Sequence, residues 1–379
     1  MYRRQFLIAS ASAAALAALR VARAQSGAAA SKLASRPRIV FDALAGAADP
    51  DQDKLPLSAG RVRDIRACGV TAINWTVSAA DLDRTVSQIA YAQALVDSDP
   101  DLWTLARRHS DIGTAAAQGQ IAILLGFQHP QPLGEHGERL ETFRRLGVRI
   151  MQLTYNNRSY FGDGCLEPAN GGLSRAGHAL VEKMNSLGVA VDLGHAGYRT
   201  TAEAIAASRT PVLITHTGCA ALHAHPRNQP DENLKALADR GGVAGIYFMP
   251  YLVASPTIPT AGHVIDHLAH ALNVAGIEHV GIGSDGDIAS VTITDEMRKY
   301  MEADMAERKR TGIAAPEEDR LPLVPELNTP RHMEMIAAGL AKRGYSPAVV
   351  DKVLGENFHR ALGDIWSSST LSPLGRGSG

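Results

Sequence analysis

The chain has 379 residues, of which 45% are hydrophobic and 20% are charged. This composition excludes a disordered chain, a collagen-like chain and a multi-span membrane protein. The 38 lysines and arginines against 39 acids give a net charge of −1, and no basic tract alternates with aromatic residues, so nucleic acid is not an expected partner. We therefore expect a globular protein that acts on a small molecule.

The first two dozen residues have the pattern of an export signal. Arg3-Arg4-Gln5-Phe6-Leu7-Ile8 is a twin-arginine pattern, and an Ala- and Leu-rich run leads from it to Ala22-Arg23-Ala24. We predict a Tat signal peptide over residues 1–24 and a spacer over 25–37, with the Tat export machinery as a partner and a periplasmic or secreted product. An uncleaved anchor is the alternative, but the run is short for a membrane span, so none is expected in the mature protein.

After the spacer, short apolar runs typical of buried strands recur, each separated by a segment long enough for a helix. The segments between them, for example 177–187 and 232–239, carry apolar side chains three and four positions apart, as amphipathic helices do. The eight predicted strands are residues 38–41, 69–76, 121–127, 149–154, 189–193, 211–215, 242–248 and 279–284.

This alternation predicts an α/β fold, a single (β/α)8 TIM-type barrel, because buried strands joined by helical crossovers form a parallel sheet. An open doubly wound sheet is the alternative, but no Gly-x-Gly-x-x-Gly turn follows the first strand. Residues 295–310 and 328–362 are predicted as extra C-terminal helices, and the charges of 298–310 are interpreted as a solvated face. The barrel domain is assigned to 38–364 and a disordered tail to 365–379.

Polar residues close several predicted strands, at the end of a parallel barrel where active sites lie. Gln128 and His129 follow the third strand, and Tyr155 follows the fourth. His195 closes the fifth strand and His216 the sixth, so their imidazoles can converge on one metal from neighbouring strands. For either histidine, a hydrogen bond to nearby backbone is the alternative.

Two more candidates follow later strands. Asp285, after the eighth strand, is placed to act as a general acid or base, although an aspartate there can also cap a turn. Arg227, in the loop after the sixth strand, can hold a carboxylate with its guanidinium, with a surface salt bridge as the alternative.

Four stretches of the chain together resemble the membrane dipeptidase family, the renal-dipeptidase-like M19 metallopeptidases of the amidohydrolase barrel type. The resemblance extends over most of residues 38–362. The stretches are MQLTYNNRSYFGDGCLEPANGGLSRAGHALVEKMNSLGVAVDLGHAG, PVLITHTGCAALHAHPRNQPDENLKALADRGGVAGI, HVGIGSDGD and LGENFHRAL.

The resemblance implies a (β/α)8 barrel with two zinc ions and a bridging water or hydroxide. It also implies hydrolysis of dipeptides, including some with a D-residue or a dehydro residue, and makes a homodimer plausible. Carried over residue by residue, His195 and His216 match two zinc-binding histidines, Asp285 matches the catalytic aspartate, and Arg227 matches the residue that binds the substrate carboxylate.

Several family positions hold other residues here. Where the family has Asp-Gly-His-x-Asp after the first strand, this chain has Asp42-Ala43-Leu44-Ala45-Gly46, so the His and Asp that hold the first zinc are absent. The bridging glutamate is replaced by Gln128, a neutral amide, and the histidine that polarises the substrate carbonyl by Tyr155, which can still donate a hydrogen bond. This set compensates the charge of two zinc ions poorly, so at most one zinc is expected.

The sequence therefore predicts an exported hydrolase that cleaves an amide bond in a small carboxylate-bearing substrate, a dipeptide or an N-acyl amino acid. The alternative is a metal-independent lyase or isomerase, or a ligand-binding pseudoenzyme, on the same barrel. The predicted site residues are the zinc ligands His195, His216 and Gln128, the catalytic residues Asp285 and Tyr155, and the substrate-binding residues Arg227 and Asn156.

Overall fold

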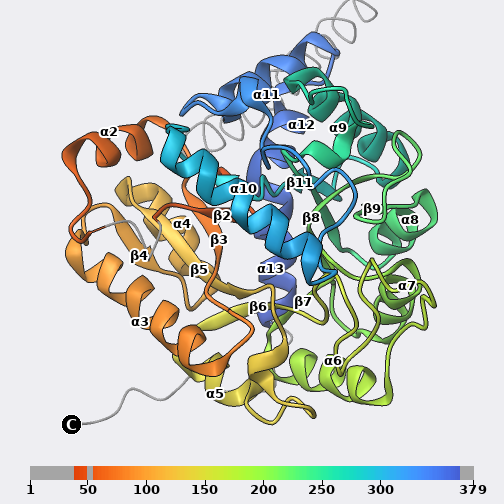
Figure 1. Cartoon of the computed structure of the whole chain (residues 1–379). Coiled ribbons are helices and arrows are strands. Elements are labelled where there is room, and N and C mark those ends of the chain that lie inside the picture. Colours follow the sequence, from red (N-terminus) through yellow and green to blue (C-terminus); the bar gives the residue numbers. More distant parts are fainter. Residues whose placement is uncertain (1–37, 49–53, 368–379) are drawn as a thin grey trace, which may run out of the picture. The chain divides into compact units, whose positions relative to one another are not determined.

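Eight parallel strands close into a barrel in the computed structural model, which describes residues 38–48 and 54–367 (Figure 1). Around the ring the strands follow the order β10-β11-β1-β3-β5-β6-β7-β8, and β8 pairs with β10 to close it. The predicted (β/α)8 barrel is confirmed. The strands are β1 (Phe41–Asp42), β3 (Ala72–Thr76), β5 (Ile121–Phe127), β6 (Val148–Gln152), β7 (Ala190–Asp192), β8 (Leu213–Cys219), β10 (Val243–Ile246) and β11 (Val280–Ile282).

Short additional strands form pairs outside the ring of eight strands. β2 (Ala45–Gly46) pairs with β12 (Gly286–Asp287), which ties the loop after β1 to the loop after β11. β4 (Trp103–Leu105) pairs with β5, and β9 (Asn228–Gln229) pairs with β8. The sequence analysis predicted none of these pairs. The predicted signal peptide, the spacer and residues 368–379 lie outside the described residues.

Helices join successive strands, and their ends follow local sequence signals. In α6, for example, the Ser174 hydroxyl accepts from the Gly177 amide, and Gly188 ends the helix with a φ of 62°, a conformation that favours glycine. The α-helices are α2 (Ala59–Ala67), α3 (Leu82–Ser98), α4 (His109–Gln118), α5 (Leu140–Leu146), α6 (Arg175–Leu187), α7 (Tyr198–Ala207), α8 (Asp231–Asp239), α9 (Ala261–Ala275), α10 (Asp295–Arg310), α11 (His332–Lys342), α12 (Pro347–Asp351) and α13 (Asn357–Ser367).

The C-terminal region differs from the single helical segment predicted over 328–362. The chain turns at Gly344, whose φ is 88°, and restarts with Pro347 in the first turn of α12. A π-helical segment, Lys352–Glu356, then leads into α13. Since α13 continues to Ser367, the helix extends beyond the boundary of 365 predicted for the tail. No helix in the described part of the chain is long and apolar enough to cross a membrane.

The Gly-x-Asn-Phe motif, Gly355-Glu356-Asn357-Phe358, leads into α13 and packs against the amino-terminal ends of strands β1 and β11. The Phe358 ring is fully buried and stacks on Phe41 of β1 with ring centroids 5.8 Å apart. The Asn357 amide donates to the carbonyls of Ile277 and Val280 at 2.9 and 2.8 Å. A Cβ on Gly355 would lie 2.6 Å from the Ile39 carbonyl oxygen, so only glycine fits there. The motif therefore stabilises the fold.

Replacing Phe358 by alanine is expected to lower the free energy of unfolding by about 3–5 kcal/mol, because the lost ring leaves a cavity beneath the strands. Urea unfolding followed by circular dichroism measures this loss. The matched control is Met335→Ala, since Met335 is 38% exposed on α11 and its truncation leaves no buried cavity. A Phe358→Ala variant as stable as that control would contradict the assignment.

Helix α10 crosses in front of the strands at one end of the barrel (Figure 1). Thr294 caps its N-terminus, acids occupy its first turn, and arginine and lysine occupy its last turn, in agreement with the helix dipole. None of its residues is buried. Its half-buried residues lie three and four positions apart, on one face: Met297, Met301, Met305 and Arg308.

Candidate active site

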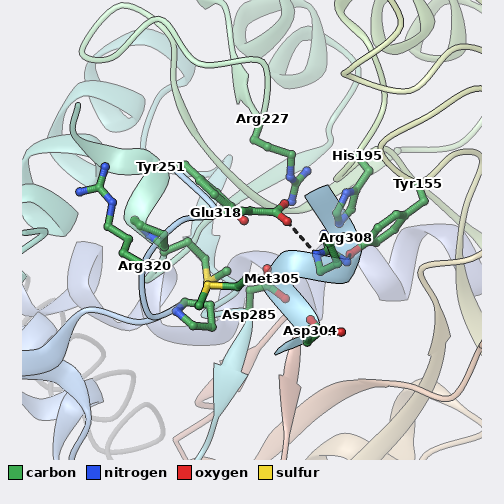
Figure 2. A pocket seen from close by; sticks show the side chains of 13 residues that line it. Tyr155, His195, Arg227, Tyr251, Asp285, Asp304, Met305, Arg308, Glu318 and Arg320 are labelled. Atoms are coloured by element: carbon green, nitrogen blue, oxygen red, sulfur yellow. Dashed lines mark hydrogen bonds and ion pairs between the residues drawn. The ribbon is translucent and has the colours of Figure 1, made fainter. Parts of the chain in front are cut away.

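A pocket of about 200 Å³, which we call the catalytic pocket, lies where the carboxyl ends of the barrel strands meet α10 (Figure 2). In parallel barrels this end carries the chemistry, because loops from several strands converge there. Side chains from the loops after β6, β7, β8, β10 and β11 meet side chains from α10 and the loop that follows it. The pocket is lined by Tyr155, His195, Arg227, Met249, Pro250, Tyr251, Asp285, Asp304, Met305, Arg308, Glu318, Arg320 and Pro322.

His195 is buried and fixed from behind by Asn156. Its Nδ1 atom lies 2.6 Å from the Asn156 side-chain oxygen, which can only accept, so Nδ1 carries the proton. Its Nε2 atom has no hydrogen-bond partner among the described residues. Tyr155 stacks on the imidazole at 4.1 Å between ring centroids, and His129 stacks on the other side of Tyr155 at 4.3 Å.

The Asn156 amide is fully buried and already bonded within the protein. Its oxygen accepts a hydrogen bond from His195 Nδ1, and its nitrogen donates to the Ile313 carbonyl at 2.8 Å. Asn156 does not line the catalytic pocket. The geometry therefore differs from the predicted substrate contact and makes Asn156 a residue that positions His195.

His216, on β8, lies beside His195 with 4.9 Å between the ring centroids. The Thr215 hydroxyl donates to the buried Asp192 carboxylate at 2.7 Å and lies 2.8 Å from His216 Nδ1. These hydrogen bonds place the imidazole proton on Nδ1 and leave Nε2 unprotonated, as outer hydrogen bonds do for histidines in metal sites. The Gln128 amide nitrogen lies 3.4 Å from that Nε2 atom.

Both imidazoles are neutral. Burial lowers the pKa of His195 and His216 well below 6.5, and the nearby Arg227 guanidinium lowers them further. The site thus holds two unprotonated Nε2 atoms without adding positive charge.

Asp285 is presented by a strained turn at the end of β11. Its φ is 58°, an uncommon value for a residue with a side chain, and its amide donates to the Leu44 carbonyl at 2.8 Å. The buried Asp42 carboxylate supports the same turn, since it accepts from the Ser284 amide at 2.8 Å and from the Leu44 amide at 3.2 Å. Loss of hydration raises the pKa of Asp285 to about 6, although Arg227 and Arg308 act in the opposite direction. Asp285 is therefore a base that is ionised at neutral pH.

Arg227 is 2% exposed, and its guanidinium donates to the Gly194 carbonyl. Its backbone amide donates a hydrogen bond of 3.1 Å to His225 Nδ1. No carboxylate forms an ion pair with it among the residues that the structure describes, so the alternative of a surface salt bridge is wrong. A buried guanidinium that lines a pocket and forms no ion pair among the described residues is chemically suited to bind an anion.

Arg308 brings a second guanidinium to the pocket, from α10 (Figure 2). Its Nε atom donates to Glu318 at 2.7 Å, and its Nη1 atom donates to the Tyr155 hydroxyl at 3.4 Å. Its guanidinium carbon lies 5.7 Å from the centre of the Tyr155 ring. Burial raises the pKa of Tyr155 above its ordinary value, and Arg308 partly offsets this rise. Tyr155 is thus a protonated donor with a cation behind its oxygen.

The sequence analysis missed Arg308 because it interpreted the charges of 298–310 as a solvated face, which is wrong for this residue. The signal was present in the spacing of the methionines: Met297, Met301 and Met305 mark one half-buried face of the helix, and Arg308 continues it. Of the other predicted residues, His195, His216, Gln128, Tyr155, Arg227 and Asp285 lie together at the strand ends.

The donor atoms at this site do not fit the two-zinc centre that the family resemblance implies. Zinc usually takes three or four protein ligands. Within residues 38–48 and 54–367, no group of three or more His, Cys, Asp or Glu could hold a metal ion. Leu44 and Gly46 supply no ligand. A single zinc at His195, His216 and Gln128 stays a prediction, with two imidazoles and one amide as its protein ligands.

Restoring the missing ligands is expected to increase metal binding. A Cβ on Gly46 would meet nothing nearer than the Gly286 carbonyl oxygen at 3.9 Å, so a side chain has room there. We expect Leu44→His/Gly46→Asp/Gln128→Glu to retain up to about two divalent ions per chain after dialysis, and more than wild type. Elemental mass spectrometry measures this, with His195→Ala/His216→Ala as the matched low-metal control. Equal metal content in the triple variant and wild type would show that the missing ligands are not what limits metal binding.

Comparisons with known proteins agree with the barrel fold and identify the family. The family model described as membrane dipeptidase (peptidase family M19) matches residues 52–303. Dipeptidase verJ of Clonostachys rogersoniana is 35% identical over 226 residues, 58% of this chain and 57% of that protein. Dipeptidase tcpJ of Claviceps purpurea is 30% identical over 279 residues, 72% of this chain and 65% of that protein. The chain thus spans about three fifths of the length of these relatives.

A solved structure shows the same barrel. The chain is similar to an amidohydrolase from Pseudomonas aeruginosa, with 32% identity, a TM-score of 0.74, and coverage of 87% of this chain and 97% of that one. Arg308, Glu318 and Arg320 lie beyond the last residue that the family model matches, 303, although they line the catalytic pocket. From the extent of the family match, the chain belongs to the membrane dipeptidase family, peptidase family M19.

Proposed function

We propose that the protein is a hydrolase that cleaves the amide bond of a small carboxylate-bearing substrate, a dipeptide or an N-acyl amino acid. One observation carries the proposal: Arg227 is buried without a carboxylate ion-pair partner among the described residues, and it lines the same pocket of about 200 Å³ as the base Asp285. Family membership supports the reaction class.

The side chains have complementary roles in this reaction. Arg227 binds the substrate carboxylate with its guanidinium fork. Tyr155, with Arg308 behind it, donates to the carbonyl oxygen and stabilises the negative charge that develops there. Asp285 takes a proton from a water molecule as that water attacks the carbonyl carbon, and then passes the proton to the leaving nitrogen as the C–N bond breaks. The products are a carboxylic acid and an amine, so one water is consumed per bond.

A substrate comparison tests the proposal. Wild type is assayed against N-acyl amino acids, dipeptides and the same compounds with the carboxylate converted to a carboxamide. We expect turnover of the carboxylates and a loss of about a hundredfold in kcat/KM for the carboxamides, because a buried guanidinium is left unpaired. In Arg227→Met the two series are expected to become equal. If wild type turned over the carboxylates and the carboxamides equally, carboxylate recognition would be contradicted. If it turned over no amide at all, the proposed hydrolase function would be contradicted.

Export belongs to the same proposal and is supported by the twin-arginine pattern alone. Arg3→Lys/Arg4→Lys is expected to keep the protein in the cytoplasm, because the Tat receptor reads both arginines. Cell fractionation with immunodetection checks this. An unchanged periplasmic fraction would contradict Tat export.

A further inference from the structure

A second pocket adjoins the catalytic pocket and has a different chemical character. Its volume is about 240 Å³, and it shares the side chains Asp285 and Pro322 with the catalytic pocket. The loop after β12, helix α10 and the segment around the short helix Pro325–Leu327 form its walls. Its apolar lining includes Phe248, Ala289, Ile293, Met301, Val324 and Leu327.

Asp287 and Asn328, two of the polar residues that line this second pocket, are already engaged. Asp287 forms an ion pair with Arg61 and accepts from the Ala289 amide at 2.8 Å. The Asn328 amide bonds to both backbone groups of Val291, at 2.8 and 2.9 Å. Among the charged residues lining this pocket, Asp285 alone is thus left to meet a ligand, at the boundary with the catalytic pocket.

His332 also lines this pocket and is neutral, and its buried Nε2 atom has no hydrogen-bond partner among the described residues. Its Nδ1 atom lies 2.8 Å from the Thr329 carbonyl, to which it donates. Burial lowers the pKa of the imidazole below its ordinary value. The pocket therefore favours an uncharged, apolar group over an ammonium or a carboxylate.

The order of residues along the two pockets gives the orientation of a substrate. Arg227 lines only the catalytic pocket, Asp285 lines both, and Met301 lines only the second pocket. A substrate with its carboxylate on Arg227 and its scissile amide at Asp285 therefore directs its acyl part into the second pocket. Each pocket alone is smaller than the roughly 300–1,000 Å³ of typical ligand sites, whereas the two together reach that range.

We propose that this second pocket is an acyl pocket, which receives the apolar acyl part of the substrate. The inference rests on the proposed hydrolase function and adds that the acyl part of the substrate is apolar. The apolar group is the alkyl chain of an N-acyl amino acid or the side chain of an apolar N-terminal residue in a dipeptide. The two sources share the same apolar contact and differ only in an ammonium group next to the amide.

Binding to an inactive variant tests the pocket without relying on turnover. N-acetyl-, N-butanoyl- and N-hexanoylglycine are titrated calorimetrically into Asp285→Asn. We expect Kd to fall about fourfold for each added methylene until the pocket is filled, because each methylene leaves water for an apolar surface.

A second pair of ligands distinguishes the two sources of the apolar group. Leu-Gly and N-(4-methylpentanoyl)glycine differ only by the amino group. Tighter binding of the acyl compound identifies an N-acyl amino acid as the substrate, and tighter binding of Leu-Gly identifies a dipeptide.

A matched pair of variants on α10 tests whether the dependence of affinity on chain length arises in the acyl pocket. Met301→Trp narrows the acyl pocket and is expected to abolish the chain-length dependence while leaving N-acetylglycine affinity unchanged. Tyr300→Trp is the control, since Tyr300 is 63% exposed on the same helix. Both substitutions are introduced into Asp285→Asn.

The outcomes separate the acyl pocket from the hydrolase. Affinity that does not depend on chain length overturns the acyl pocket, even if wild type hydrolyses N-acetyl amino acids. Chain-length-dependent affinity that Met301→Trp removes supports the pocket, even if wild type hydrolyses no amide, in which case the proposed hydrolase fails. A chain-length dependence that survives Met301→Trp also overturns the assignment.

Discussion

Asp285→Asn is expected to lower kcat/KM for amide hydrolysis by about a thousandfold, because the amide cannot accept the proton of the attacking water. The change is isosteric, so the strained turn at φ 58° and its bond to Leu44 are retained. Steady-state kinetics on the best substrate of the screen measure the loss. Retained turnover would remove Asp285 from the mechanism.

The same residue sets the pH dependence. Since the pKa of Asp285 is about 6 and the base form is the ionised one, kcat/KM in wild type is expected to rise with pH, with a midpoint near 6, and to level off above it. The residual activity of Asp285→Asn is expected not to show this rise of kcat/KM with pH. A wild-type profile that is flat between pH 5 and 8 would contradict the assignment.

Folding supplies the control for this variant. The native pKa of Asp285 lies above its ordinary value of 3.8, so the native state binds the proton more tightly than the unfolded state. The stability contributed by this group is thus complete below about pH 4 and falls as the pH rises through about 6. Asparagine does not titrate, so Asp285→Asn does not lose this stability as the pH rises, and we expect its Tm at pH 7.5 to equal or exceed that of wild type. A lower Tm would indicate that the variant loses activity because it misfolds.

Arg308→Met is expected to lower kcat by about a hundredfold, because Tyr155 then loses the cation that helps it to stabilise the oxyanion. Tyr155→Phe is expected to cost a similar factor. The double variant should be little worse than either single variant, since both act on the same hydrogen bond. Arg308→Lys keeps the charge and is expected to recover part of the activity.

The control for Arg308 is Arg310→Met. Arg310 belongs to the same turn of α10 but pairs with Glu307 at an exposed position. Its replacement is expected to leave kcat unchanged. Independent, multiplicative effects of Arg308→Met and Tyr155→Phe would show that the two residues do not act as a pair. An increase in KM with unchanged kcat would assign Arg308 to substrate binding instead.

The barrel could be predicted because its eight strands lie in mainly apolar runs that are buried on both faces. The Ile121–Phe127 strand matches its predicted bounds, and the others differ by a few residues. The pairing of Ala45–Gly46 with Gly286–Asp287 could not be predicted, because two-residue strands carry no periodicity and form only when the barrel brings distant loops together.

The site was predictable where chemistry coincides with the end of a strand, as for His195, His216 and Asp285. Arg308 was not identified, because a charged helix shows no sign of which arginine faces a pocket until the helix is placed on the barrel. For Asn156, in contrast, the sequence suggested a role at the pocket that the geometry does not support. Its position next to Tyr155 suggests contact with substrate, whereas its amide faces away from the pocket, toward His195 and Ile313.

The position of α10 also bears on how such a protein can change over evolution. Its residues line both pockets, yet none of them belongs to the hydrophobic core. Most core substitutions cost stability, whereas exposed ones away from special features cost little. Drift in Met301 or Met305 can therefore alter substrate preference while the barrel is conserved. The segment acts as an exchangeable cover on a constant scaffold, and relatives with the same barrel are expected to diverge in specificity mainly there.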